Sequence, residues 1–193
     1  MWCLTGPFAF LPIHAAGIYT REMAISVSDY VVSSYVPTIS SLLRVLTPTA
    51  HPTCSTKPFK MMVVIQPQTL WYADKELQNI AGHVPNECLV KLGVPGVSAT
   101  VDKVTSHLSA VSIAHFACHG EQNKMNPLES SLILEDGQLK ISRIMQESTL
   151  NASLAVLCAC ETAKGDEDLP DEAMHLGATL LFAGFHGVVA TMW

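Results

Sequence analysis

Continuous apolar runs alternate with amphipathic segments along most of the chain from residue 59 onward. The runs carry apolar side chains at nearly every position, which is typical of strands buried on both faces of a parallel sheet. They occupy residues 61–66, 111–118, 153–160 and 187–193, with a weaker run at 87–92. The amphipathic segments have helical spacing and occupy residues 73–84, 98–108, 141–148 and 171–185. This alternation predicts an α/β core with a mostly parallel sheet and helices on both faces.

Two local signals add detail to the predicted core, which covers residues 59–193. Ser98 is the candidate N-cap of the helix at 98–108. The stretch "SLILEDGQL", residues 131–139, predicts a hairpin or a short strand because Asp-Gly separates two apolar runs.

Residues 1–46 follow a different pattern from the rest of the chain. The stretch at 2–17 predicts a pair of strands around Gly6 and Pro7, and the stretch at 28–46 predicts a strand broken at Pro37 and then a helix. We expect this part to extend the same sheet, so that residues 1–193 form a single domain. A Pro/Ser/Thr-rich patch at 47–58 is the one plausible internal junction.

The amino-acid composition narrows the classes of binding partner expected for this chain. Hydrophobic residues make up 49% of the chain and charged residues 15%, and the formal net charge is −6. Lysine and arginine are scattered, so the chain lacks the basic patch expected for nucleic-acid binding. The most apolar stretch, 176–193, is interrupted by His186 and neighbouring glycines, which predicts a buried helix and strand rather than a membrane span.

The six cysteines lie in or beside apolar runs, and no secretory signal pattern precedes them. Cys158 and Cys160 would lie about 6.6–7 Å apart on an extended strand, near the upper limit for a disulfide. We therefore expect reduced thiols and a cytoplasmic location.

Unusual side chains gather where two predicted strands end. "HFACHG" (115–120) closes one strand and "LCACET" (157–162) closes another. In parallel α/β sheets, sites form beyond the carboxyl ends of the strands. We therefore expect His119 and the cysteines of the second motif to lie at one edge of the sheet.

Alternation along the first strand separates its candidate residues. His115 and His119 share one face, whereas Cys118 points to the other. We interpret His115, two residues deeper, as a hydrogen-bonded core histidine. A zinc site built from Cys118, His119, Cys158 and Cys160 has suitable atoms but not the ligand spacing of structural zinc sites, so we predict no metal.

A catalytic pair fits the motifs better. Neighbouring strands lie about 4.8 Å apart, so His119 ending one strand and Cys160 ending the next can meet. The histidine can take the thiol proton and so activate the cysteine as a nucleophile. The Gly120 region, with the backbone N–H of Cys160, can supply an oxyanion hole.

At these residues the chain resembles the CHAT domain, a caspase-like peptidase domain related to separase and often attached to tetratricopeptide repeats. The resemblance covers essentially residues 1–193. It is carried by the stretches "HFACHG", "LAVLCACETAKG", "GATLLFAGFHGVVATMW", "LTGPFAFLPIHAAG" and "SDYVVSSYVPTISSLL".

The resemblance implies a caspase-hemoglobinase-like three-layer α/β sandwich. It places the family's general base on His119 and its nucleophile on Cys160. Cys158 stands where a small residue usually precedes the nucleophile motif. Because family members continue past the Trp of "ATMW", here Trp193, we expect a C-terminally truncated fragment of a longer protein with repeat domains before residue 1.

Two acidic residues are further candidates for substrate binding. Glu161, next to Cys160, either orients the substrate or caps the following turn. Asp29 lies in a stretch that runs near the substrate groove in related folds. It either favours a basic side chain before the cleaved bond or is a solvated aspartate at a strand end.

The leading hypothesis is a cysteine endopeptidase that cleaves a protein substrate with a His–Cys dyad in a regulatory or cell-death-type pathway. The alternative is a catalytically inactive signalling or scaffold module of a repeat-containing protein. We expect no cofactor, no nucleic acid and no membrane partner.

Overall fold

The computed structural model describes residues 1–40, 43, 58–66, 68–123, 125–147, 153–158 and 176–190. The chain forms two compact units. One consists of Met1–Pro48 with Gly165–Met174, and the other of Thr49–Lys164 with His175–Trp193.

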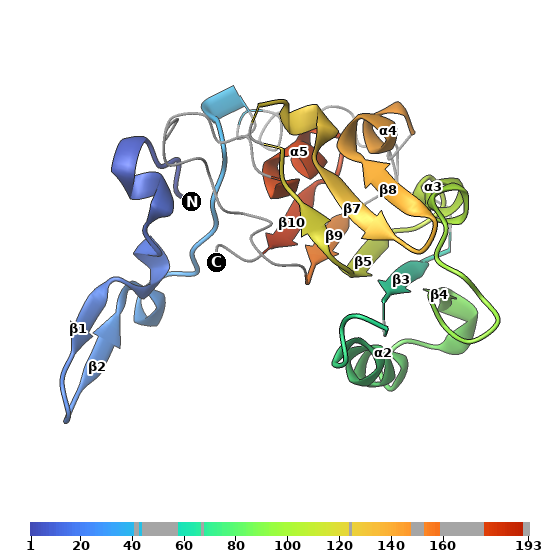
Figure 1. Cartoon of the computed structure of the whole chain (residues 1–193). Helices are drawn as coiled ribbons and strands as arrows, with labels where there is room; N and C mark the ends of the chain where they lie inside the picture. Colours follow the sequence, from blue (N-terminus) through green and yellow to red (C-terminus); the bar gives the residue numbers. More distant parts are fainter. Residues whose placement is uncertain are drawn as a thin grey trace. The chain divides into compact units, whose positions relative to one another are not determined.

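A five-stranded parallel sheet is the centre of the larger unit (Figure 1). Its strand order is β10-β9-β5-β3-β4, so β5 lies between β9 and β3. The strands are β3 (Met61–Ile65), β4 (Leu89–Leu92), β5 (Ile113–Ala117), β9 (Leu154–Leu157) and β10 (Gly187–Ala190). Each predicted strand of the core is therefore confirmed within the described residues.

Helices pack on both faces of this sheet, as predicted. One face holds a core of buried side chains from the strands and from α3 (Val101–Leu108), α4 (Ile141–Gln146) and α5 (Leu176–Phe182). The opposite face packs against α2 (Ala73–Ala81) through Ala73 and Leu77. Because both faces are covered, the interior strand β3 is apolar and buried at every position.

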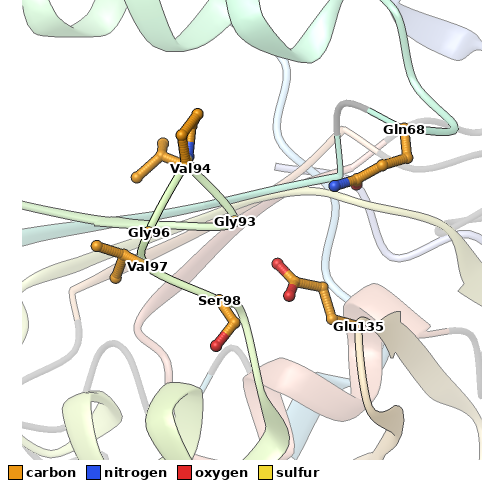
Figure 2. A pocket seen from close by; sticks show the side chains of 8 residues that line it. Gln68, Gly93, Val94, Gly96, Val97, Ser98 and Glu135 are labelled. Carbon is orange, nitrogen blue, oxygen red and sulfur yellow. The ribbon is translucent and has the colours of Figure 1, made fainter.

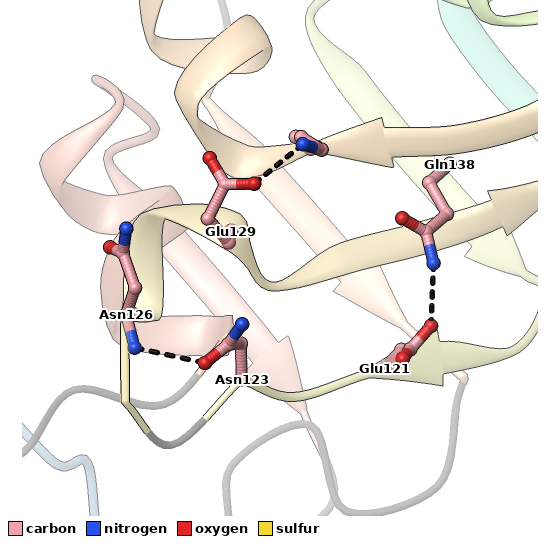
Figure 3. Close-up of polar contacts among 6 residues, drawn as sticks. Glu121, Asn123, Asn126, Glu129 and Gln138 are labelled. Atoms are coloured by element: carbon pink, nitrogen blue, oxygen red, sulfur yellow. Dashed lines mark hydrogen bonds and ion pairs between the residues drawn. The ribbon is translucent and has the colours of Figure 1, made fainter.

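A small antiparallel sheet adds to the first of these cores. It comprises β6 (Gly120–Glu121), β7 (Ser131–Leu134) and β8 (Gly137–Lys140), which confirms the predicted hairpin. Figure 3 shows its outer polar contacts: Gln138 Nε2 donates to Glu121 Oε2 at 2.7 Å, and Lys140 pairs with Glu129. The short helix η5 (Pro127–Glu129) lies in the connection between β6 and β7.

The segments before and after β4 differ in part from the sequence-based prediction. The short helix η4 (Asn86–Cys88) leads directly into β4. The N-cap of α3 is Thr100, whose hydroxyl accepts a hydrogen bond from Lys103 N–H at 3.4 Å. The prediction of Ser98 was wrong because the chain stays non-helical until Val101.

Two predictions for the N-terminal unit were wrong. Gly6–Phe10 (η1) and Ile13–Ala15 (η2) are 3₁₀ helices instead of a strand pair, because Pro7 suits the first turn of a helix. The strand pair comes later, in β1 (Gly17–Tyr19) and β2 (Ala24–Ser26). Those two strands pair antiparallel in a two-stranded sheet.

The stretch after β2 is also not the predicted strand. Val27–Asp29 forms the 3₁₀ helix η3, begun by a capping box between Ser26 and Asp29. Farther on, the backbone of Tyr35 forms an isolated β-bridge with Trp2, while Ile39 and Ser40 are helical.

Within the described segments, no helix combines the length and apolar character needed to cross a membrane. The predicted helix at 171–185 is observed as α5, and residues 171–175 lie outside the described part.

Candidate functional site

His119 lies where the chain leaves the parallel sheet. β5 ends at Ala117, and Gly120 begins β6. The backbone of His119 is held on both sides: its N–H donates to Gln66 Oε1 at 3.4 Å, and its carbonyl accepts from Ile133 N–H at 2.8 Å. The imidazole is therefore carried on a fixed, half-buried stretch at the carboxyl end of the strand.

The strand that leads toward the second motif is the direct neighbour of β5. Phe116 lies opposite Leu157, and Cys158 N–H donates to the carbonyl of Phe116 at 2.9 Å. The two strand ends therefore lie side by side, as the motif positions predicted. Cys160 and Glu161 lie outside the described residues, so the dyad itself stays a prediction.

The remaining predicted residues have mainly local contacts. Gly120, in β6, pairs with Leu132 of β7, and its proposed role toward an oxyanion stays a prediction. The Asp29 carboxylate accepts from Ser26 N–H at 2.6 Å and from the Ser26 hydroxyl at 3.3 Å. Asp29 thus caps η3 in the N-terminal unit, and its role in substrate binding also stays a prediction.

The structure brings together three other side chains on the α2 face of the sheet: Glu76, His115 and Cys158. The potential ligand atoms of all three lie within 4.8 Å of one another. Glu76 Oε1 is 3.2 Å from His115 Nε2 and 3.0 Å from Cys158 Sγ. One carboxylate oxygen from α2 therefore bridges the two neighbouring strands β5 and β9.

Sequence reasoning missed Glu76, although a signal for it exists. Ala73, Leu77 and Ile80 form the apolar stripe with which α2 packs on the sheet. Glu76 lies three residues after Ala73 and four before Ile80, so it belongs to that same stripe. An acidic residue on the buried face of a helix indicates a partner inside the fold.

His115 is buried, as predicted, with 5% of its surface exposed. Its Nε2 lies 3.2 Å from Glu76 Oε1, within ion-pair distance, but this buried nitrogen has no hydrogen-bond partner, so the predicted hydrogen bond is not found at this atom. Burial lowers the pKa of His115, and the nearby Glu76 carboxylate only partly opposes that effect. The imidazole is therefore neutral near pH 7.

Cys158 is chemically unlike an activated nucleophile. Cys158 is an exposed residue, but loss of water around its sulfur, followed by the hydrogen bond and the negative charge of Glu76, raises the pKa of its thiol to about 12. A thiol with this pKa is protonated at neutral pH, and only the thiolate attacks carbonyl groups. His115 and Cys158 lie close together, but they do not form a thiolate–imidazolium pair.

Cys118 points to the opposite face, as the alternation predicted. It is fully buried in the core shared with α3, α4 and α5, and burial raises its pKa to about 12. The ligand set of Cys118, His119, Cys158 and Cys160 is therefore not assembled, since Cys118 and Cys158 lie on different faces. Among the described residues, Glu76, His115 and Cys158 are the group that could hold a metal ion.

A polar recess lies beyond the carboxyl ends of β3 and β4 (Figure 2). It has a volume of about 460 Å³ and is lined by Gln68, residues 93–98 and Glu135. Glu135 Oε1 accepts from Ala99 N–H at 2.9 Å. Because parallel strands end at a common edge, this recess opens on the edge of the sheet that also carries His119.

Comparison with known protein families matches residues 1–193 to the CHAT domain. A search of curated proteins finds no match. The family match covers the whole chain, including both strand-end motifs.

Proposed function

The chain belongs to the CHAT domain family, and from this membership we propose that it is a cysteine endopeptidase that cleaves a protein substrate with His119 and Cys160. The family is associated with caspase-like cysteine peptidase domains, and the parallel sheet covered on both faces agrees with that fold. The observation that carries the proposal is the pairing of β5 with β9: the strand that ends before His119 is the neighbour of the strand that leads to Cys160.

The proposed reaction uses the two residues in succession. His119 takes the proton of the Cys160 thiol, and the thiolate attacks the carbonyl carbon of a peptide bond. The tetrahedral intermediate collapses to an acyl-enzyme, and the imidazolium gives its proton to the departing amine. Water, deprotonated by His119, then hydrolyses the thioester and regenerates the free thiol.

Strand geometry supports the reach that this reaction needs. Neighbouring strands are about 4.8 Å apart. Ala117 and Cys158 lie at the neighbouring ends of β5 and β9. His119 comes two positions after Ala117, and Cys160 comes two positions after Cys158. Gly120, next to the base, lacks a side chain that would block approach of a substrate carbonyl to the backbone.

We assign substrate recognition to two acidic residues, Glu161 and Asp29. Glu161 follows the nucleophile directly and orients the substrate, and Asp29 favours a basic side chain before the cleaved bond. The polar recess containing Glu135 supports binding of a peptide along the same edge. We place the activity in a cytoplasmic regulatory or cell-death-type pathway, under the control of N-terminal repeat domains in the full-length protein.

Covalent labelling tests the nucleophile. A peptide probe with an electrophilic carbonyl is expected to modify the purified protein at Cys160, as read by mass spectrometry of the intact protein and its tryptic peptides. Cys160→Ala is expected to abolish the labelling. His119→Ala is expected to slow it about 10²–10⁴-fold, the usual contribution of general acid–base catalysis.

Cys88→Ala is the matched control, since Cys88 is a partly buried free cysteine outside the site and its loss is expected to leave labelling unchanged. Labelling that persists unchanged in Cys160→Ala would assign the reactivity elsewhere and reject the peptidase proposal. A full-length protein whose cellular effect survives Cys160→Ala would favour the scaffold alternative.

A further inference from the structure

The group formed by Glu76, His115 and Cys158 has no role in the proposed peptidase reaction. These residues come from α2, from β5 and from the end of β9, and they are 39 or more positions apart in the chain. Only packing of α2 on the sheet places them together. From this group the geometry points to a binding site for one Zn²⁺ ion.

The separations between the donor atoms suit a small ion with short bonds. Zinc binds nitrogen, oxygen and sulfur ligands at about 2.0–2.3 Å, so tetrahedral geometry places neighbouring ligand atoms about 3.4–3.6 Å apart. Glu76 Oε1 lies 3.2 Å from His115 Nε2 and 3.0 Å from Cys158 Sγ. Movements of less than about 1 Å would therefore bring the three atoms around one zinc ion.

A second observation on His115 points independently to a ligand. Its Nε2 is buried and lacks a hydrogen-bond partner, yet it faces the Glu76 carboxylate. Buried polar atoms nearly always have a partner, and a coordinated ion would supply the missing one. A neutral imidazole offers the lone pair that coordination requires.

Exposure and donor type decide which ion fits. Cys158 is exposed and Glu76 is partly exposed, so an ion can enter from one side and keep a water molecule as fourth ligand. One sulfur, one nitrogen and one oxygen match the preference of zinc, whereas Mg²⁺ and Ca²⁺ prefer oxygen ligands alone. Binding replaces the thiol proton of Cys158, which leaves to solvent, by a zinc–thiolate bond.

Titration of the reduced, metal-free chain tests this site. Zn²⁺ is expected to bind at one ion per chain, to raise the temperature of thermal unfolding by tying α2 to β5 and β9, and to release a proton. Co²⁺ is expected to bind in its place and give the near-ultraviolet charge-transfer band of a cobalt–thiolate bond. Mg²⁺ is expected to leave the unfolding temperature unchanged.

Single substitutions locate the ligands. Cys158→Ser is expected to abolish the cobalt–thiolate band, and Glu76→Gln to weaken zinc binding at least about 100-fold, since losing even an outer-shell partner costs about 10–100-fold. Cys88→Ser and Glu87→Gln, which change a cysteine and a glutamate outside the group, are expected to bind zinc normally. Circular dichroism of each variant tests whether it is folded. If Cys158→Ser unfolds, Glu76→Gln provides a second variant that is expected to fold, because Glu76 is partly exposed.

Two results would overturn the assignment. One is the absence of stoichiometric zinc binding by the folded, reduced chain. The other is binding that survives both Cys158→Ser and Glu76→Gln but disappears in Cys160→Ser, which would place the ion on the proposed peptidase dyad.

Discussion

A single carboxylate, that of Glu76, determines the chemistry of the two neighbouring side chains on the α2 face. It accepts the Cys158 S–H at 3.0 Å and lies 3.2 Å from the His115 Nε2. Partial loss of water around the sulfur disfavours ionisation of the thiol, and the hydrogen bond to Glu76 and its negative charge act in the same direction. Cys158 is therefore an exposed residue with a poorly reactive thiol, which distinguishes it from the proposed nucleophile two positions later.

Alkylation of Cys158 by iodoacetamide is expected to be slow and strongly pH-dependent in the metal-free protein. With a pKa raised from 9.0 to about 12, the thiolate fraction near pH 7 is about a thousandth of that of an ordinary thiol. The rate should rise about tenfold per pH unit below the folded-state pKa, because the thiolate fraction does. Glu76→Gln removes the negative charge, one of the three causes of the shift, and should speed alkylation, as measured by mass spectrometry of the Cys158 peptide.

The control for this measurement is Glu87→Gln, which removes an exposed charge outside the group and should not change the rate. An unchanged or slower rate in Glu76→Gln would show that the carboxylate does not control the thiol.

At the scale of the elements, the loop after β4 shows how backbone geometry shapes the sheet edge. Gly93 has a φ of +85°, and its N–H donates to the carbonyl of Val97 at 2.8 Å, which closes a tight turn. A β-carbon at Gly93 would lie 1.9 Å from the carbonyl oxygen of Ile65 in the neighbouring strand β3. The polar recess at this edge therefore depends on a glycine at the end of β4.

Gly93→Ala and Gly96→Ala form a matched pair of variants. The pair separates the cost of a left-handed backbone conformation from the cost of a steric clash with β3. Gly96 has a φ of +83°, and a β-carbon there would meet no atom within 4 Å. Gly96→Ala is expected to cost about 1–2 kcal/mol in unfolding free energy, the ordinary cost of a left-handed residue. Gly93→Ala should cost about 1–3 kcal/mol more, because it forces a contact with an interior strand. Urea denaturation measures both, and equal costs would show that β3 and β4 can separate freely.

At the scale of the whole molecule, one buried core of the larger unit joins the parallel sheet to the antiparallel one. Leu132 and Leu139 from the hairpin are fully buried in the same cluster as Phe116 from β5. This shared core holds the turn at His119 between the two sheets. The position of the proposed base therefore depends on packing that is distributed over several elements.

Leu132→Ala tests this dependence against Leu128→Ala. Leu132 is fully buried, so its truncation is expected to cost about 2–5 kcal/mol in unfolding free energy. Leu128, in η5, is 41% exposed, and its truncation should cost less than about 1 kcal/mol. Chemical denaturation compares the two leucines, and similar small effects would mean that the hairpin is not part of the core.

Local sequence signals anticipated most elements of the larger unit and failed in the smaller one. The run Met61–Ile65 is apolar throughout, so burial on both faces follows directly from its composition. The stretch at 2–17 is also rich in apolar residues, but a 3₁₀ helix begins there at Gly6, and apolar character alone does not distinguish a strand from such a helix. Ser26 and Asp29 had capping-box spacing, a signal for η3 that the prediction of a strand overlooked.

The sequence by itself determined the alternation of strands and helices, the family resemblance, and the position of His119 at a strand end. These are properties of local pattern and of motif order, which do not depend on distant contacts. Only the tertiary structure decided that β5 neighbours β9, that β1 and β2 form their own sheet, and that Glu76 meets His115 and Cys158. Strand order and convergence of side chains depend on how separate elements pack, and a one-dimensional pattern does not specify that packing.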